Sequence, residues 1–209
     1  MNRCRALLAQ TVTDFAKTNY LHFILSHFII KSVLSLKGDF SMAFKEVDIK
    51  SLNFNPFTKI GSEWMLITAG NESGCNTMTA SWGGLGVLWG KNVATCYIRP
   101  QRYTKKFVDA NDTFTLSFYG PEYKQALSIC GSKSGRDCDK VKEAGLTPYF
   151  TDGTAAFEEA SMVFVCRKLY EDEIKPENFI AKENDGKWYP EKDYHTVYIA
   201  EITKVLVKE

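Results

Sequence analysis

Histidine is scarce in this sequence, and neither sign of charge predominates. Only three of the 209 residues are histidines, and His195 alone lies after residue 41. Because no Ser, Cys or Asp motif accompanies His195, we expect a surface or hydrogen-bonded structural histidine without a catalytic role. The 26 Lys and Arg and the 25 Asp and Glu give a formal net charge of +1. No basic cluster stands out, which argues against nucleic acid as a partner.

The cysteines form neither a metal-binding nor a disulfide pattern. An odd number follows residue 41, with no C-x-x-C pair and no histidine at ligand spacing. These are Cys75, Cys96, Cys130, Cys138 and Cys166. The simplest interpretation is a reduced, cytoplasmic protein without a structural metal, in which most cysteines are buried or half-buried.

Two common nucleotide-binding fingerprints are also missing. The run Gly131-Ser132-Lys133-Ser134 has no glycine directly before the lysine, as a Walker A motif requires. The glycine-rich stretch 83–90 lacks the G-x-G-x-x-G spacing and the following amphipathic helix of a dinucleotide fold, so we expect a tight loop between strands there. Without a dinucleotide fingerprint, the sequence does not distinguish NADH from NADPH as a partner.

The first 41 residues differ in character from the rest. The apolar stretch 20–36 is interrupted by His22, His27 and Lys31 and is shorter than the roughly 20 residues that cross a bilayer. No small-residue cleavage pattern of a secretory signal follows it. The alternatives to a span are an interfacial helix, a poorly ordered extension and a misplaced start upstream of Met42, of which we favour the last. We therefore expect an extension over residues 1–41, one domain over 42–209, and no membrane association.

Strand patterns dominate residues 42–209. Five segments are rich in β-branched and aromatic residues, and the alternation within 113–118 predicts half-buried strands of a mainly antiparallel sheet. Short helices are expected at 103–110, 122–130 and 137–144. Long crossover helices are absent, so we predict a mainly β fold, a small antiparallel β-barrel with short helices. The predicted strands are 64–69, 93–98, 113–118, 162–170 and 196–207.

One segment has the composition of a cofactor site. Residues 76–82 interleave small hydroxyl side chains with Asn and Ala, and Arg99 and Arg102 follow after one strand. Such residues offer amide and hydroxyl donors together with fixed positive charge, which suits a phosphate-bearing cofactor. From the residues alone a pyridoxal derivative also fits, whereas haem fits poorly because His195 is the single histidine available for ligation.

Four blocks in order resemble the flavin reductase-like family of FMN-binding split barrels. They are Asn76–Gly84, Tyr97–Thr104, Thr113–Phe118 and Cys130–Asp137. The last block is similar to a bacterial, flavoredoxin-like branch, and the resemblance extends over about the whole of 42–209. It implies an antiparallel FMN-binding split β-barrel that forms a homodimer, with FMN near the subunit interface.

The resemblance also implies which residues bind FMN. Residues 77–82 would line the ring and the ribityl chain, and residues 132–134 would close the site. The phosphate would be flanked by Arg99, Arg102, Tyr103 and Thr104. The implied set is Asn76, Thr77, Met78, Thr79, Ala80, Ser81, Trp82, Arg99, Pro100, Arg102, Tyr103, Thr104, Ser132, Lys133 and Ser134. No catalytic side chain and no metal are expected, because the flavin itself carries the redox reaction.

The leading functional hypothesis is a flavin reductase that transfers hydride from NAD(P)H to FMN, with electrons then passing to free flavin or a protein acceptor. The alternative is a non-enzymatic, flavoredoxin-like electron-transfer protein. Residues 187–194, which include Trp188 and Tyr189, form either a lid over the flavin or a contact with the partner subunit. Trp89 is expected to be a core aromatic residue.

Overall fold

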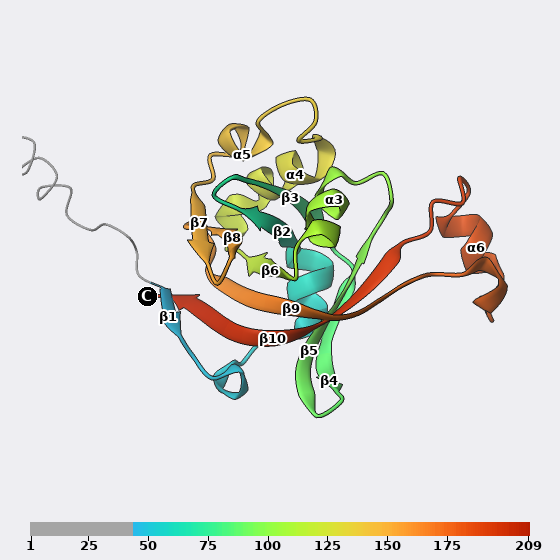
Figure 1. Ribbon diagram of the computed structural model, residues 1–209, viewed down its shortest axis with the longest axis horizontal. Helices are drawn as coiled ribbons and strands as arrows, with labels where there is room; N and C mark the ends of the chain where they lie inside the picture. The colour runs from blue at the N-terminus through green and yellow to red at the C-terminus, as the bar shows by residue number, and fades with distance from the viewer. Residues whose placement is uncertain (1–43) are drawn as a thin grey trace, which may run out of the picture. The chain divides into compact units, whose positions relative to one another are not determined.

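The computed structural model describes residues 44–209 (Figure 1). The expectations for residues 1–41 lie outside these described residues. Within them, no helix is both long and apolar enough to cross a membrane. The strands are β1 (Phe44–Glu46), β2 (Met65–Asn71), β3 (Gly74–Ala80), β4 (Gly83–Leu88), β5 (Lys91–Ile98), β6 (Thr113–Phe118), β7 (Pro148–Thr151), β8 (Thr154–Phe157), β9 (Met162–Glu173) and β10 (Thr196–Lys208).

Short helices and helical turns separate the strands. They are η1 (Ile49–Ser51), α2 (Pro56–Thr58), η2 (Lys59–Glu63), α3 (Tyr103–Ala110), η3 (Pro121–Tyr123), α4 (Lys124–Ser132), α5 (Lys140–Glu143), η4 (Pro176–Asn178) and α6 (Glu183–Trp188). Helix α3 has the predicted bounds. The predicted helix 122–130 is η3 followed by α4. The third is shorter than expected, because the Asp139 side chain caps α5 and the left-handed Gly145 follows its end.

One antiparallel sheet carries the fold. Its strands follow the order β3-β2-β6-β9-β10-β5-β4, and β1 also pairs with β10. Strand β10 therefore joins the β9 side of the sheet to the β5 side. The long β9 and β10 strands extend together to one end of the domain, where η4 and α6 connect them (Figure 1). The predicted mainly β, antiparallel fold with short helices is confirmed.

Both faces of the central strands are buried. Phe114, Leu116 and Phe118 of β6 belong to the main hydrophobic core, which also contains residues of β2, β5, β9 and β10. On the opposite face, Thr115 donates a hydrogen bond of 2.6 Å to the carbonyl oxygen of Ala155 in β8. The prediction of a half-buried β6 is therefore wrong, because β8 packs against the face that carries the hydroxyl residues.

The glycine-rich stretch is a strand and not a loop. Gly83–Leu88 pairs along its whole length with β5, and the turn is confined to Trp89 and Gly90, whose φ angles are 51° and 69°. Two successive positive φ angles are the geometry of a tight hairpin turn. Trp89 is 61% exposed at this turn, so the prediction of a core tryptophan is wrong.

Candidate functional site

The segment that begins the predicted cofactor site forms strand β3. Its register on β2 pairs Thr77 with Thr68, and the two side-chain oxygens lie 2.8 Å apart in the core. The Thr77 hydroxyl also lies 3.2 Å from the carbonyl oxygen of Ile67. Thr77 is fully buried, so its side chain stabilises the sheet and does not face a cavity. The polar composition of the segment concealed this strand from sequence analysis, because Asn, Gly and Thr resemble loop residues.

A cavity of about 320 Å³, here called the basic cavity, lies between β3, α3 and the end of α4. Four of its lining side chains are cationic, and none is acidic. The first turn of α3 also borders it, which adds the positive end of a helix dipole. Its lining residues are Met78, Gln101, Arg102, Tyr103, Thr104, Ser132, Lys133, Ser134, Arg136 and Lys140. This set of donors suits an anion such as a phosphate.

Lys140 is the most unusual of these cations. Its side chain is 4% exposed, and its ammonium donates to the carbonyl oxygens of Cys130 at 3.0 Å and Lys133 at 3.1 Å. No carboxylate among residues 44–209 pairs with it, and burial lowers the pKa of its ammonium group. An ammonium with neutral partners alone retains its attraction for an anion. Sequence analysis missed Lys140, because its partners are backbone groups that leave no side-chain pattern.

The other three cations are held at the rim of the basic cavity. Arg102 donates to the carbonyl oxygen of Gly131 at 2.9 Å, and Arg136 donates to that of Gln101 at 3.1 Å. The Arg136 guanidinium also lies 4.8 Å from the centre of the Tyr103 ring. Lys133 instead forms an ion pair with Glu143, which partly neutralises it. Arg102 and Arg136 therefore keep a full positive charge at this rim.

Asn76 supports the basic cavity from behind. Its side-chain amide donates to the Thr104 hydroxyl at 2.8 Å, which ties β3 to the first turn of α3. Both residues are buried, and Thr104 also lines the cavity. Gly135 lies directly over Asn76, where an added Cβ would be 2.2 Å from the Asn76 Oδ1 atom. The loop after α4 can therefore approach β3 closely only with glycine at this position.

A second cavity, here called the central cavity, has a volume of about 220 Å³ and adjoins the basic cavity through Met78 and Arg102. It is lined by the end of β3, by β5 and by residues before β10. These residues are Met78, Thr79, Ala80, Ser81, Trp82, Tyr97, Arg99, Arg102, Trp188 and His195. The Thr79 hydroxyl is already engaged, because it donates to the carbonyl oxygen of Leu127. Aromatic rings at one end and Arg102 at the other suit a flat molecule with an anionic tail.

Residues 188–193 cover one side of the central cavity. Arg99 forms an ion pair with Asp193 and donates to the carbonyl oxygen of Trp188 at 2.8 Å. Hydrogen bonds from Arg99 and Gln101 lower the pKa of the Asp193 carboxyl. The Trp188 ring packs edge-on against Trp82, with 5.2 Å between the ring centres. Arg99 therefore holds this segment against the cavity, and its charge is balanced by Asp193.

His195 lines the central cavity and is 7% exposed. Its Nδ1 atom lies 2.8 Å from the Tyr189 hydroxyl, and its ring centre lies 5.2 Å from that of Trp82. Burial, with a smaller contribution from Arg99, lowers the pKa of His195 to about 4. The imidazole is therefore neutral near pH 7. The expectation of a hydrogen-bonded histidine is confirmed, whereas a position on the surface is wrong.

The structure separates the predicted site residues into three groups. Asn76 and Thr77 lie behind the cavities, and Pro100 is exposed and lines neither. The second group lines the central cavity and consists of Met78, Thr79, Ala80, Ser81, Trp82 and Arg99. The third group lines the basic cavity and consists of Tyr103, Thr104, Ser132, Lys133 and Ser134. Arg102 lines both cavities. Residues from distant parts of the chain are thus brought together as one continuous site.

No group of His, Cys, Asp and Glu within residues 44–209 has the arrangement of a metal site. The five cysteines in this part of the chain are free thiols. Cys96 and Cys166 are buried in the core, and this burial raises the pKa of both thiols. Buried thiols of this kind are inert packing residues.

Solved structures with the same fold come from several bacteria. The FMN-binding domain of a flavin reductases-like enzyme from Shewanella baltica is 15% identical, with a TM-score of 0.57, and 79% of this chain and 78% of that chain are covered. Flavoredoxin of Desulfovibrio vulgaris is 20% identical, with a TM-score of 0.56 and the same coverage. The styrene monooxygenase flavin reductase of Pseudomonas putida is 14% identical, with a TM-score of 0.52, and 70% of this chain and 80% of that chain are covered.

No curated protein sequence matches the chain significantly. The family model described as "Flavin reductase like domain" matches residues 57–209, which include nearly all of the described strands and both cavities. The match extends over well more than half of the sequence. The chain therefore belongs to the flavin reductase-like domain family.

Proposed function

We propose that the chain binds FMN, with the phosphate in the basic cavity and the ring system toward the central cavity. The observation that carries this proposal is the basic cavity itself, in which four cationic side chains and four hydroxyl side chains converge without an acidic lining residue. A phosphate dianion finds both charge and donors there. The aromatic residues of the adjoining cavity offer flat apolar surfaces to a ring. The family and the FMN-binding domain from Shewanella baltica support the same cofactor.

The reaction that we propose is flavin reduction by NAD(P)H. When bound, FMN would supply the redox chemistry, as the acceptor of hydride from the nicotinamide and the source of electrons for free flavin or a protein acceptor. The chain contributes binding, orientation and polarity. Lys140 and Arg102 hold the anionic end, while Trp82 and Trp188 form an aromatic wall. His195 presents a neutral imidazole whose Nδ1 atom is fixed by Tyr189.

The second candidate is electron transfer without enzymatic reduction, as the resemblance to flavoredoxin suggests. The exposed edge of the site favours this possibility, since Trp82 and Trp188 are both partly accessible to a protein partner. A pyridoxal phosphate derivative also satisfies the charge of the basic cavity, but the family match favours flavin.

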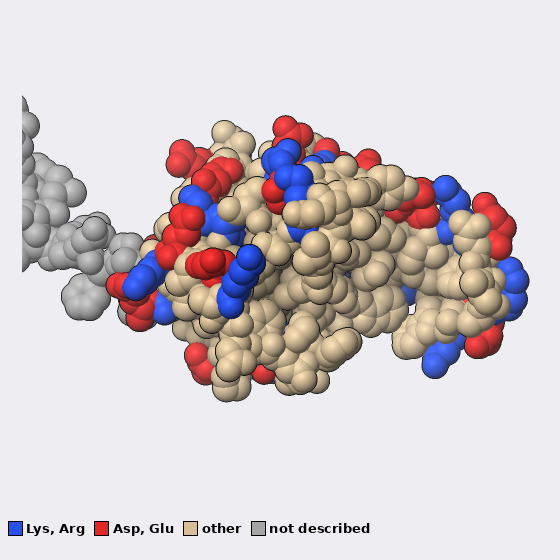
Figure 2. Space-filling view, turned by 90° about the horizontal axis from the view of Figure 1, so that it is seen from below, with Lys and Arg blue, Asp and Glu red and all other residues tan. Residues whose placement is uncertain are grey.

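We also propose that two copies of the chain form a homodimer through the β4–β5 hairpin. Val87 and Trp89 are highly exposed there, and the Trp89 ring lies 6.5 Å from that of Tyr170, which is exposed as well. Figure 2 shows that charged side chains gather toward the ends of this face and are sparse in its middle. Contiguous exposed apolar residues of this kind mark protein interfaces.

A cytoplasmic location accords with the free cysteines of the described residues.

The donor of electrons is tested by absorbance spectroscopy. The purified protein, supplied with FMN if it is colourless, receives NADH and then NADPH under anaerobic conditions. We expect the bands of the bound flavin to bleach within seconds with one of the two nucleotides. Bound flavin that stays oxidised with both would favour the electron-transfer protein. Failure to bind FMN at all would contradict the proposed cofactor.

Lys140→Met tests the phosphate position. Loss of a charge-assisted contact costs about 1.5 to 3 kcal/mol, so we expect FMN to bind about 10- to 100-fold more weakly in a fluorescence titration. Lys142→Met removes the same charge from the exposed side of α5 and is the matched control, with unchanged affinity expected. If both variants bind FMN as tightly as the original protein, the phosphate does not bind in the basic cavity.

His195→Gln tests the burial of a neutral imidazole. The unfolded chain has a histidine pKa near 6.5, whereas the folded value is about 4, so falling pH favours the unfolded state. The stability that the neutral His195 contributes is complete above pH 6.5 and is lost as pH falls toward 4. The loss amounts to about 3 kcal/mol in total. We expect urea unfolding to show a smaller loss over this range in the variant. Parallel stability curves for both proteins would show that His195 is not the titrating group.

Trp89→Glu tests the dimer. Placing a carboxylate in an apolar contact carries a desolvation penalty, so we expect dissociation into monomers in sedimentation velocity measurements. Phe150→Glu replaces an exposed aromatic residue of strand β7 in the same way and is the control, and we expect it to leave the dimer intact. A dimer that persists in the Trp89 variant would place the interface elsewhere.

A further inference from the structure

A third cavity borders the central cavity on the side away from the basic cavity. It has a volume of about 520 Å³ and shares Ser81, Trp82 and Tyr97 with the central cavity. None of its lining residues is charged, in contrast to the four cations of the basic cavity. We call it the apolar cavity. Its composition selects against ions, because an ion that leaves water finds no counter-charge there.

The polar groups of the apolar cavity lie where it meets the central cavity. Ser81 and Tyr97 carry hydroxyl groups, and neither hydroxyl forms a hydrogen bond with another of residues 44–209. A hydroxyl that is not engaged elsewhere can donate to a ligand oxygen. A few polar groups at one end of an apolar pocket fix the orientation of a small molecule.

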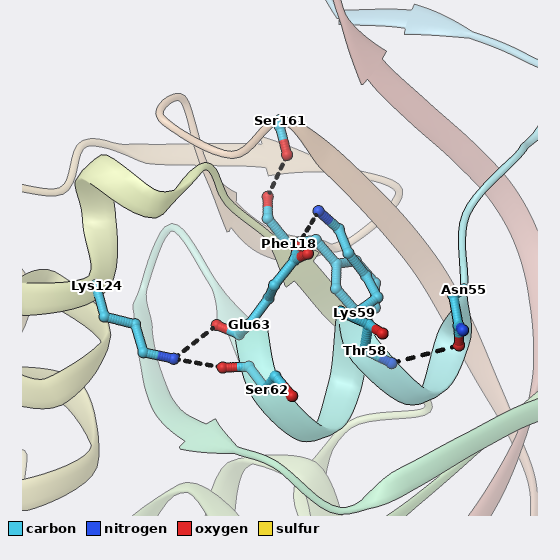
Figure 3. Close-up of polar contacts among 8 residues, drawn as sticks. All are labelled: Asn55, Thr58, Lys59, Ser62, Glu63, Phe118, Lys124 and Ser161. Carbon is cyan, nitrogen blue, oxygen red and sulfur yellow. Dashed lines mark hydrogen bonds and ion pairs between the residues drawn. The ribbon is translucent and has the colours of Figure 1, made fainter.

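The outer wall of the apolar cavity is the α2–η2 segment. Phe57 and Ile60 line the cavity, and Phe57 is 86% exposed at its mouth. Asn55 caps the start of this segment by accepting from the backbone N–H group of Phe57 at 2.9 Å. It also accepts from the backbone N–H group of Thr58 at 3.4 Å (Figure 3). An exposed aromatic side chain beside an apolar cavity indicates a surface that contacts a ligand.

The end of this wall is fixed from outside the cavity. The Lys124 ammonium donates to the carbonyl oxygen of Ser62 at 2.6 Å (Figure 3). It also lies 3.2 Å from the centre of the Trp64 ring. Trp64 has a φ of 73° and a ψ of 169°, a backbone conformation that is strained for any residue other than glycine. Segment η2 is a π-helix, a form that is frequent at functional sites. A strained wall with its own anchor indicates a shape retained for a ligand.

From these features we propose that the apolar cavity binds a neutral, planar ring compound that carries a carbonyl oxygen. The ring packs against Trp82 and Phe57, and the carbonyl oxygen accepts a hydrogen bond from Tyr97 or Ser81. The phosphates of a dinucleotide find no cation in this lining. This assignment goes beyond the proposed flavin reduction, since it names a second ligand class and a second site.

Two glycines of β4 provide a matched test. An added Cβ at Gly84 or at Gly86 meets no atom within 4 Å, and neither residue has a positive φ. Both lie on the same face of the strand, but only Gly84 lines the apolar cavity. Gly84→Val therefore places a side chain into the cavity, and Gly86→Val makes the same change outside it.

The probe is 2-acetylnaphthalene, a neutral aryl ketone, and its anionic analogue is 6-acetylnaphthalene-2-sulfonate. Equilibrium dialysis of the full chain measures both. We expect the neutral ketone to bind the original protein and Gly86→Val alike, and to bind Gly84→Val at least about tenfold more weakly. We expect the sulfonate to bind all three proteins at least about tenfold more weakly than the ketone binds the original protein.

A parallel FMN titration separates this proposal from the previous one. Unchanged FMN affinity in Gly84→Val, together with weaker ketone binding, supports a separate site. The proposal is overturned if the original protein does not bind the ketone, if the sulfonate binds equally well, or if Gly84→Val retains full ketone affinity. Loss of FMN binding in Gly84→Val also overturns it, because the cavity would then belong to the flavin ring. Failure of the original protein to bind FMN, with ketone binding as expected, would contradict only the cofactor proposal.

Discussion

The register of β10 on β5 is the constraint on which the site depends. Thr196 pairs with Ile98, so the residues just before β10 lie beside those just after β5. This pairing brings Asp193 within reach of Arg99 and places His195 in the same cavity as Tyr97. A shift by one residue would turn His195 to the other face of the sheet. Bulges between β9 and β10 occur farther along and leave this register intact.

Charge is distributed along the site in an ordered way. The basic cavity has four cations, the central cavity shares one of them and adds Arg99, and the apolar cavity has none. The charge of Arg99 is balanced by Asp193, so the unbalanced positive charge is concentrated where Lys140 and Arg136 lie. A molecule with an anionic tail and an uncharged ring thus has one favourable orientation in the site.

The sequence predicted the parts of the fold that rest on side-chain type. Strands such as β6 and β9 were found because β-branched and aromatic residues fill them. Strands β3 and β4 were missed because Gly, Asn and Thr occupy positions where neighbouring strands supply the packing. For the site, the clustering of hydroxyl and Arg residues indicated the central and basic cavities. Lys140 was missed, and His195 was predicted only as a structural histidine, because only the folded chain brings them to the cavities.

The contrast between Lys140 and Lys133 explains how one loop can both bind an anion and hold its own shape. Lys133 is exposed and pairs with Glu143, so an added anion would compete with a carboxylate for it. Lys140 is buried and donates to the carbonyl oxygens of Cys130 and Lys133. These two hydrogen bonds connect the end of α4 to α5. Carbonyl oxygens do not neutralise the positive charge of this ammonium, so a bound anion is attracted by the full charge. The same residue thus fixes the loop and retains positive charge, which a surface lysine cannot do.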